Sequence, residues 1–315
     1  MNVQTILGAG GAIGKALAKE LPAYTHTIRL VSRHPQKVND DDELFTADLL
    51  DSQQVMQAVA GSEVVYLTAG LQYSTKIWQA QWPVIMRNTI GACIAAKSRL
   101  VFFDNIYMYD PNHLNPMTES TPIAPGSEKG KVRAAIVDML MTAVKEKGLQ
   151  ALVARSADFY GFSIANVSML TETVIKPLSE KKTANWFMDA NRLHSFTWVP
   201  DAAKATAMLG NTPDAFGETW HLPTAAHPLT GKQWVELMAG LLNVQPKYRV
   251  VGKTLTHIMG WFMPIMREMA EMLYQYDRDY VFDSSKFERR FNYTPVGYEE
   301  GARMIAENDY GRLKV

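Results

Sequence analysis

The chain has 315 residues, of which 47% are hydrophobic and 20% charged, and its 32 basic and 32 acidic residues give no net charge. This composition supports a sizeable apolar core and excludes a largely disordered chain. Because there is neither an excess of positive charge nor a run of Lys and Arg, nothing favours a nucleic-acid partner.

The only cysteine, Cys93, lies in an apolar stretch, so we expect a buried structural thiol in a reducing cytoplasm. No basic segment followed by an apolar run opens the chain, which argues against a signal peptide. No apolar stretch approaches the roughly 20 residues of a membrane span, and the nearest, 258–266, is broken by Pro264. We therefore expect a cytoplasmic protein with no membrane partner.

The first half of the chain alternates strand and helix patterns. Strands are predicted at 3–7, 27–32, 44–47, 64–68, 100–103 and 150–155, and helices at 11–21, 52–60, 76–97 and 128–147. Strands separated by helices favour an α/β fold with a doubly wound parallel Rossmann sheet.

After residue 160 the pattern becomes poorer in strands. Helices are predicted at 166–178, at 201–209 and after a capping Thr230, with short strands at 196–199 and 219–222. We predict a dinucleotide-binding domain of residues 1–160 plus about 194–212. Residues 161–193 and 213–315 would form a smaller, mostly helical substrate lobe over the carboxyl edge of the sheet.

A glycine-rich turn connects the first predicted strand to the first predicted helix. Glycine occupies positions Gly8, Gly11 and Gly14, and the helix begins near Ala12 and Ile13. Glycines allow the backbone to approach a pyrophosphate, which the free N–H groups of the helix start then bind. The turn therefore predicts a bound dinucleotide, with an ordinary tight turn as the alternative.

The end of the second predicted strand indicates which dinucleotide is bound. An NAD site usually has an acidic residue here, whereas this chain has Ser32 and Arg33, with Lys37 nearby. These groups suit a 2′-phosphate, so we predict NADP, with NAD as second choice and a solvated basic turn as the alternative. Asp48 and Leu49 follow the third strand and suit the adenine edge.

The glycine spacing, with Asp48-Leu49 and Thr68-Ala69-Gly70, resembles the short-chain dehydrogenase/reductase superfamily. Segments 101–109, 155–161 and 194–203 resemble its extended branch, the NAD-dependent epimerase/dehydratase-like proteins, so the likeness covers residues 3 to about 240. The resemblance implies further site residues. Cofactor contacts would come from Thr68, Ala69, Gly70, Ala157, Asp158 and Phe159, and substrate contacts from Tyr73, Tyr109, Tyr160 and His194.

The same family uses a Tyr-x-x-x-Lys pair and a serine or threonine for proton transfer. Alignment puts Ser127 at the tyrosine position, Lys131 at the lysine and Asn105 at the serine or threonine. Lys129 leaves the helical register open, although no tyrosine precedes it at the family's spacing either. The literal pair Tyr310 and Lys314 follows no fifth strand, so we interpret it as a coincidence.

The missing phenol has three candidate replacements. Tyr107 and Tyr109 flank the loop after the fifth strand, and Tyr73 follows the fourth. The alternative for all three is an aromatic wall, because tyrosine packs its ring and leaves its hydroxyl hydrated. No helical His-x-x-x-His pair or second cysteine is present, so we expect no metal site.

Two hypotheses remain from the sequence. The first is an NADP-dependent oxidoreductase or epimerase acting on a small carbonyl or sugar-type substrate, with a homodimer as the candidate assembly. Lys131 would hold the ribose and Asn105 a substrate oxygen. The second, motivated by the missing tyrosine, is a non-catalytic sensor that binds NADP and a protein partner.

Overall fold

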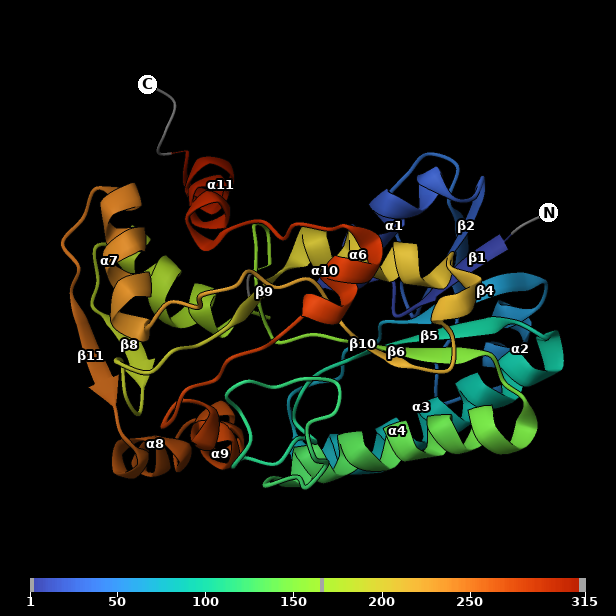
Figure 1. Ribbon diagram of the computed structural model, residues 1–315, viewed down its shortest axis with the longest axis horizontal. Coiled ribbons are helices and arrows are strands. Elements are labelled where there is room, and N and C mark those ends of the chain that lie inside the picture. The colour runs from blue at the N-terminus through green and yellow to red at the C-terminus, as the bar shows by residue number, and fades with distance from the viewer. Residues whose placement is uncertain (1–2, 165–166, 312–315) are drawn as a thin grey trace. The chain divides into compact units, whose positions relative to one another are not determined.

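The computed structural model describes residues 3–164 and 167–311, which form two compact units (Figure 1). Unit 1 comprises Met1–Met108, Glu128–Ser156 and Ala202–Leu222, and unit 2 comprises Tyr109–Ser127, Ala157–Asp201 and Pro223–Val315.

Unit 1 is built on one seven-stranded parallel sheet. Its strands are β1 (Val3–Leu7), β2 (Thr27–Ser32), β3 (Glu43–Thr46), β4 (Ser62–Leu67), β5 (Arg99–Asp104), β6 (Ala151–Arg155) and β10 (Thr219–His221). They lie in the order β10-β6-β5-β4-β1-β2-β3, and every pairing is parallel. This order reverses direction between β1 and β4, which confirms the predicted doubly wound fold.

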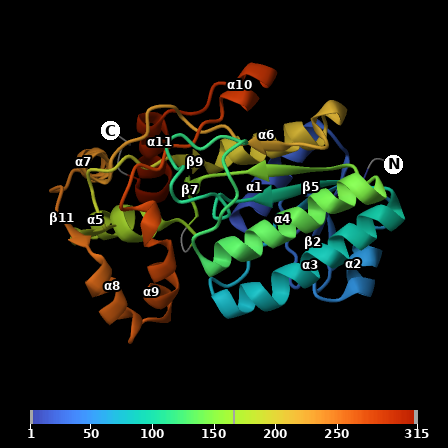
Figure 2. The same cartoon turned by 60° about the horizontal axis from the view of Figure 1, so that its bottom comes forward.

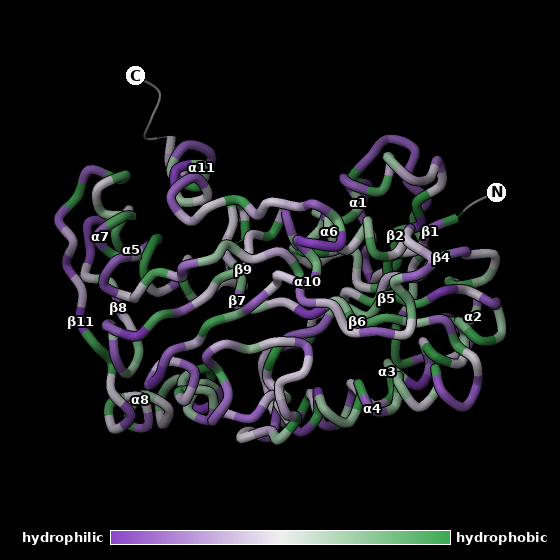
Figure 3. Tube along the Cα trace, in the orientation of Figure 1, coloured by the Kyte–Doolittle hydropathy of each residue, from purple (hydrophilic) through white to green (hydrophobic). Residues whose placement is uncertain are grey.

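Helices cover both faces of this sheet. They are α1 (Ala12–Glu20), α2 (Ser52–Val59), α3 (Thr75–Ala96), α4 (Glu128–Lys147) and α6 (Val199–Gly210). Helices α2, α3 and α4 lie on one face, with α3 and α4 packed side by side, and α1 and α6 lie on the other (Figure 2). Every residue of β1 and β6 is buried, and hydrophobic residues gather along the central strands (Figure 3). Cys93 is also buried, as predicted, and burial raises the pKa of its thiol.

Unit 2 is mostly helical. Its helices are α5 (Lys176–Ser179), α7 (Gly231–Leu242), α8 (Lys253–Gly260), α9 (Pro264–Met269), α10 (Ser285–Phe291) and α11 (Tyr298–Tyr310). Two small parallel sheets pair β7 (Asp158–Tyr160) with β9 (Phe196–Trp198), and β8 (Ala184–Phe187) with β11 (Tyr248–Val251). The predicted Thr230 cap is confirmed, because its side chain and that of Gln233 form a reciprocal capping box.

Several segments differ from the sequence prediction. Strands β7, β8 and β11 were not predicted, because three or four residues are too few for a periodic pattern. Of the helix predicted at 166–178, Asn166 lies outside the described residues, and Thr171–Ile175 adopts wider π-helical turns. Residues 109–127, 157–160 and 194–201 belong to unit 2. Residues 213–222 belong to unit 1, because β10 pairs with β6.

No helix in the described part of the chain combines the length and the apolar character needed to cross a bilayer. Within the same residues, no group of three or more His, Cys, Asp or Glu side chains is arranged to hold a metal ion.

Candidate functional site

The glycine turn of unit 1 is held against two backbone segments. Gly8 has a φ of +94°, and a Cβ built there would lie 2.4 Å from the Ala69 Cα, immediately after β4. A Cβ on Gly14 would lie 2.8 Å from both the Gly8 carbonyl oxygen and the Ala9 Cα. Glycine is therefore required at both positions, because any side chain would push the turn away from β4 or from α1.

The first turn of α1 follows the glycine turn directly in the chain. Gly11 is its N-cap and provides no side chain, so no side-chain oxygen caps the N–H groups around Ala12 and Ile13. Nearby, at the end of β2, the Ser32 hydroxyl is buried and has no hydrogen-bond partner among the described residues. A cradle that excludes Cβ atoms, an uncapped helix start and an unpartnered hydroxyl fit a pyrophosphate with its ribose.

The residues directly after β2 include no carboxylate, and the exposed Asp40 and Asp41 lie further along the same loop. Arg33 and His34 are both exposed. The acidic run that follows is partly structural, since buried Asp42 accepts hydrogen bonds from the backbone N–H groups of Val38 and Asn39 at 2.9 and 2.7 Å. Asp42 therefore stabilises its own loop.

Asp48 and Leu49 lie in the loop between β3 and α2. The exposed Asp48 carboxylate accepts a hydrogen bond from the Leu50 N–H at 3.0 Å, and the Leu49 carbonyl oxygen accepts one from the Asn88 side chain at 3.0 Å. The loop is thus fixed by its own contacts while a carboxylate stays open to solvent.

A buried ionic cluster fixes how α4 lies on the sheet. Asp104, the last residue of β5, is bound by Arg133 from α4 at 2.8 Å and by Arg155 from β6 at 3.0 Å. All three side chains are at most 4% exposed. The Arg133 guanidinium also lies 4.5 Å from the ring centre of Trp82. Together these contacts set which face of α4 is buried.

That rotation separates the two lysines at the start of α4. Lys131, expected to hold the ribose, has a side chain 62% exposed that pairs with Glu128 at 2.6 Å. Lys129, one turn before Arg133, is fully buried and donates a hydrogen bond to the Thr75 hydroxyl at 2.9 Å. Two helical positions differ by about 200°, so only one of the two can face the interior.

An aromatic group surrounds Lys129. Its ammonium lies 4.6 Å from the ring centre of Tyr73, and Tyr73 packs edge-on against Trp78. Tyr107 stacks on the same Trp78, with ring centres 6.1 Å apart. The Asn105 side-chain oxygen accepts a hydrogen bond from the Tyr107 N–H at 3.1 Å, so Asn105 shapes the loop after β5.

The other two candidates for proton transfer lie in unit 2, and both are buried. Tyr109 is 0% exposed and pairs across a β-bridge with Ile123. Ser127 lies beside Tyr274, where burial raises the pKa of the Tyr274 phenol and the Ser127 hydroxyl opposes that rise.

The segment after β6 also lies in unit 2. The Ala157 N–H donates to the Thr197 hydroxyl at 3.2 Å, and the Phe159 carbonyl oxygen accepts from Ser168 at 2.7 Å. Asp158 is hydrogen-bonded to the His194 ring at 3.0 Å and accepts from the Tyr276 phenol at 3.3 Å.

Two of the residues expected to bind substrate lie inside unit 2. The imidazole of His194 is 2% exposed and is sandwiched between the rings of Tyr276 and Tyr280, at 4.6 and 4.3 Å. Tyr160 is 0% exposed and packs against Trp198, and burial raises the pKa of its phenol. Both positions are explained by core packing, and neither side chain is open to a substrate.

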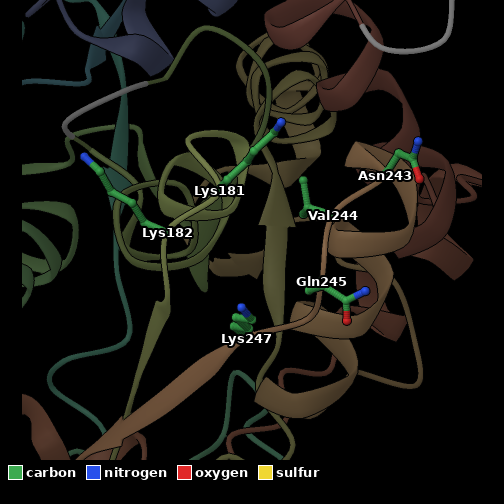
Figure 4. A pocket seen from close by; sticks show the side chains of 6 residues that line it. All are labelled: Lys181, Lys182, Asn243, Val244, Gln245 and Lys247. Carbon is green, nitrogen blue, oxygen red and sulfur yellow. The ribbon is translucent and has the colours of Figure 1, made fainter.

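Unit 2 also has a pocket that the sequence did not indicate. It has a volume of about 320 Å³ and is lined by Lys181, Lys182, Asn243, Val244, Gln245 and Lys247 (Figure 4). None of these residues belongs to the segments expected to bind the cofactor.

Two features of the site escaped sequence reasoning. The first is the burial of Lys129, which the sequence had left open as an alternative register to Lys131. The second is the Asp104 cluster, whose members are far apart in sequence and had no motif. A signal for Lys129 was present, since Lys129 and Arg133 are four residues apart and therefore share one helix face.

The chain was compared with protein families, curated proteins and solved structures. Residues 5–222 match the profile of the family described as NAD dependent epimerase/dehydratase family. An Arabidopsis thaliana protein named 3beta-hydroxysteroid-dehydrogenase/decarboxylase isoform 2 is 25% identical over 298 residues, covering 84% of this chain. This chain spans about half, 52%, of that relative.

Solved structures with low sequence identity share the fold. A Thermus thermophilus UDP-glucose 4-epimerase in complex with NAD matches with a TM-score of 0.78, 18% identity and full coverage of both chains. A Streptomyces venezuelae dTDP-glucose 4,6-dehydratase with NAD bound matches with a TM-score of 0.75, 16% identity and 97% coverage of both chains. Because the family profile covers more than half of the chain, this protein belongs to the NAD dependent epimerase/dehydratase family.

Proposed function

We propose that this protein is an NADP-dependent oxidoreductase or epimerase that acts on a small carbonyl or sugar-type substrate. The glycine turn carries the proposal, because Gly8 and Gly14 leave no space for a Cβ and bring the backbone to an uncapped helix start. Related proteins solved with NAD support a nicotinamide cofactor. When bound, such a cofactor supplies or accepts a hydride at a substrate carbon.

The groups after β2 support NADP rather than NAD. Arg33 is exposed beside the buried, unpartnered hydroxyl of Ser32, and Asp42 is engaged by its own loop. Arginine binds phosphate through a rigid fork of donors, so Arg33 would contact a 2′-phosphate. Asp48 would receive the adenine edge, and the backbone of residues 68–70 would lie along the dinucleotide.

For the ribose next to the nicotinamide, we assign Lys129 in place of Lys131. Lys129 lies on the buried face of α4, whereas Lys131 points to solvent and pairs with Glu128. Lys129 is as buried as Tyr160, so to reach the ribose its ammonium would have to exchange the bond to Thr75 and become accessible. Of the three phenols we assign proton transfer to Tyr73, because its ring centre lies 4.6 Å from the Lys129 ammonium that we assign to the ribose.

Asn105 and Tyr107 would then shape the substrate side of the loop after β5. Their mutual contact and the Tyr107 stack on Trp78 support a positioning role rather than proton transfer. Nothing in the fold or among the relatives favours the regulatory alternative, in which the protein only senses NADP.

The cofactor preference is tested by titrating the protein separately with NADPH and with NADH and monitoring binding by fluorescence. We expect NADPH to bind at least tenfold more tightly, and the Arg33→Ala variant to lose this preference while its NADH affinity is unchanged. Tighter NADH binding by the unmutated protein would refute the NADP assignment.

Turnover is tested separately. Purified protein is assayed with NADPH against a panel of ketones and aldehydes by the absorbance at 340 nm. It is assayed with NADP+ against nucleotide sugars by the stereochemistry of the product. Reduction of one carbonyl class by NADPH, or epimerisation of one sugar class with NADP+, is expected. Binding of cofactor with no turnover anywhere on the panel would contradict the catalytic proposal and leave the cofactor site intact.

A further inference from the structure

An apolar hairpin projects into solvent from unit 2. We define this hairpin as α8, α9 and the turn between them, residues 253–269. Among the described residues, six of the thirteen exposed large hydrophobic side chains fall within residues 255–265 of it: Leu255, Ile258, Trp261, Phe262, Met263 and Ile265. Trp261 and Phe262 are 82% and 81% exposed, the highest values in that group. Such a concentration on one element marks an interaction surface.

The tip of the hairpin is an ordered turn. The N–H groups of Trp261 and Phe262 donate to the carbonyl oxygens of Ile258 and Met259 at 3.2 and 3.1 Å. A Cβ built on Gly260 would lie 3.2 Å from the Arg267 Cα, so glycine allows α8 and α9 to cross closely. Pro264 then starts α9 with its ring at the first turn. The two exposed aromatic rings are therefore presented by a fixed backbone.

The exposed apolar residues continue along one side of α8. Leu255 and Ile258 are three residues apart on one face of α8, and Phe262 follows in the turn after the helix. The buried residues of α8 are instead Thr256 and Gly260. The helix thus packs on its own unit through a small polar face and turns its hydrophobic face outward.

The charged residues in and before the hairpin are mainly basic. No aspartate or glutamate occurs from residue 237 to residue 267, whereas this stretch holds Lys247, Arg249, Lys253 and Arg267. Carboxylates return only at Glu268 and Glu271, which are half-buried in the α9 region. Exposed tryptophan and phenylalanine bordered by cations are typical of segments that lie in the headgroup region of an anionic membrane.

We propose that this hairpin docks the protein on the surface of a bilayer containing anionic lipids. The Trp261 and Phe262 rings enter the interfacial region, and Lys253 and Arg267 contact lipid phosphates. The hairpin is too short to span a bilayer, so the association is peripheral and reversible. An exposed apolar turn bordered by Lys253 and Arg267 suits a lipid interface, and the proposal is independent of the reaction proposed for unit 1.

Vesicle flotation with the full chain tests the proposal. Two kinds of vesicle are compared. Neutral vesicles contain phosphatidylcholine alone, and anionic vesicles contain phosphatidylcholine with about 30% phosphatidylglycerol. We expect flotation with the anionic vesicles, at least tenfold weaker binding by Trp261→Ala/Phe262→Ala, and several-fold weaker binding by Lys253→Glu. The matched controls Ile123→Ala, at an exposed hydrophobic outside the hairpin, and Lys145→Glu on α4 should bind like the unmutated protein.

Tryptophan fluorescence gives a second readout, because Trp261 stands apart from the others. The remaining six tryptophans are at most 7% exposed, so acrylamide quenching reports mainly Trp261. Anionic vesicles should reduce that quenching and shift the emission to shorter wavelength, and Trp261→Phe should abolish the change. No protection by vesicles would overturn the proposal. If acrylamide quenching of Trp261 fell with rising protein concentration in the absence of lipid, the proposal would also be overturned. The hairpin would then be assigned to contact with a second copy of the chain.

Discussion

The Lys129 ammonium donates a hydrogen bond to the Thr75 hydroxyl at 2.9 Å, which joins the first turn of α4 to the first residue of α3. One turn further along α4, Arg133 binds Asp104 at the carboxyl end of β5. Both basic side chains face the interior because they are four residues apart on one helix. The Asp104 cluster thus orients the lysine that we assign to the cofactor.

Replacement of the two lysines separates their roles. Under the proposed function, Lys129→Ala weakens NADPH binding at least tenfold, about 1.4 kcal/mol, because it removes the buried ammonium that would hold the ribose. Lys131→Ala changes only an exposed pair with Glu128 and leaves the affinity within about twofold. Isothermal titration of both variants, with circular dichroism to verify folding, measures the difference. Equal losses in both variants would contradict the assignment.

Proton transfer can be assigned in the same way. Tyr73→Phe keeps the ring over Lys129 and removes only the hydroxyl, so we expect kcat to fall by about 10²–10⁴ with cofactor affinity preserved. Tyr107→Phe keeps the stack on Trp78 and should reduce kcat by a few-fold at most. Steady-state kinetics on whichever substrate the panel identifies distinguishes them. A larger kcat effect at Tyr107 would transfer the role to that residue.

The glycine turn predicts an effect on both folding and binding. Gly14→Ala places a Cβ 2.8 Å from two backbone atoms, and we expect a loss of about 1–3 kcal/mol in unfolding free energy and at least tenfold weaker cofactor binding. Gly91→Ala is the control, since Gly91 is exposed within α3 with no atom within 4 Å of the added Cβ. It should stabilise the protein by about 0.5–1 kcal/mol. Urea unfolding and NADPH titration measure both quantities.

The Asp104 cluster predicts a large stability effect. Asp104→Asn leaves the guanidinium groups of Arg133 and Arg155 buried without their counter-charge, so we expect a loss of about 3–5 kcal/mol in unfolding free energy. Asp138→Asn alters an exposed carboxylate on the same helix α4 and should stay within about 0.5 kcal/mol of the unmutated protein. A loss below 1 kcal/mol in Asp104→Asn would show that the cluster contributes little.

Alkaline pH should weaken the fold through buried phenols. Burial raises the pKa of Tyr66 above its ordinary value near 10, and its hydroxyl donates to the Gln4 side chain at 2.7 Å. Because the folded state holds the proton more tightly, the stability contribution is complete below about pH 10 and is lost as the pH rises further, by up to about 1.4 kcal/mol per pH unit.

The Tyr66→Phe variant tests that linkage. It should cost about 1 kcal/mol at pH 7 through the lost hydrogen bond, and above pH 10 its unfolding free energy should fall less steeply than that of the unmutated protein. Urea unfolding at pH 7 to 11 gives both slopes, with Tyr248→Phe on β11 as the control. Identical slopes in the Tyr66→Phe variant and the unmutated protein would contradict the prediction.

Local sequence was sufficient for the sheet, the glycine turn and the buried Cys93, because each follows from short-range periodicity or from glycine's conformational freedom. The sequence also showed that Arg33, and not a carboxylate, follows Ser32. It was insufficient for the rotation of α4, which depends on Asp104 and Arg155 from two distant strands, and so it favoured Lys131 over Lys129. Packing likewise placed Tyr160 and His194 inside unit 2 and turned the hydrophobic face of α8 outward. A helix pattern in sequence gives the presence of an apolar face, whereas only tertiary contacts decide whether that face is covered.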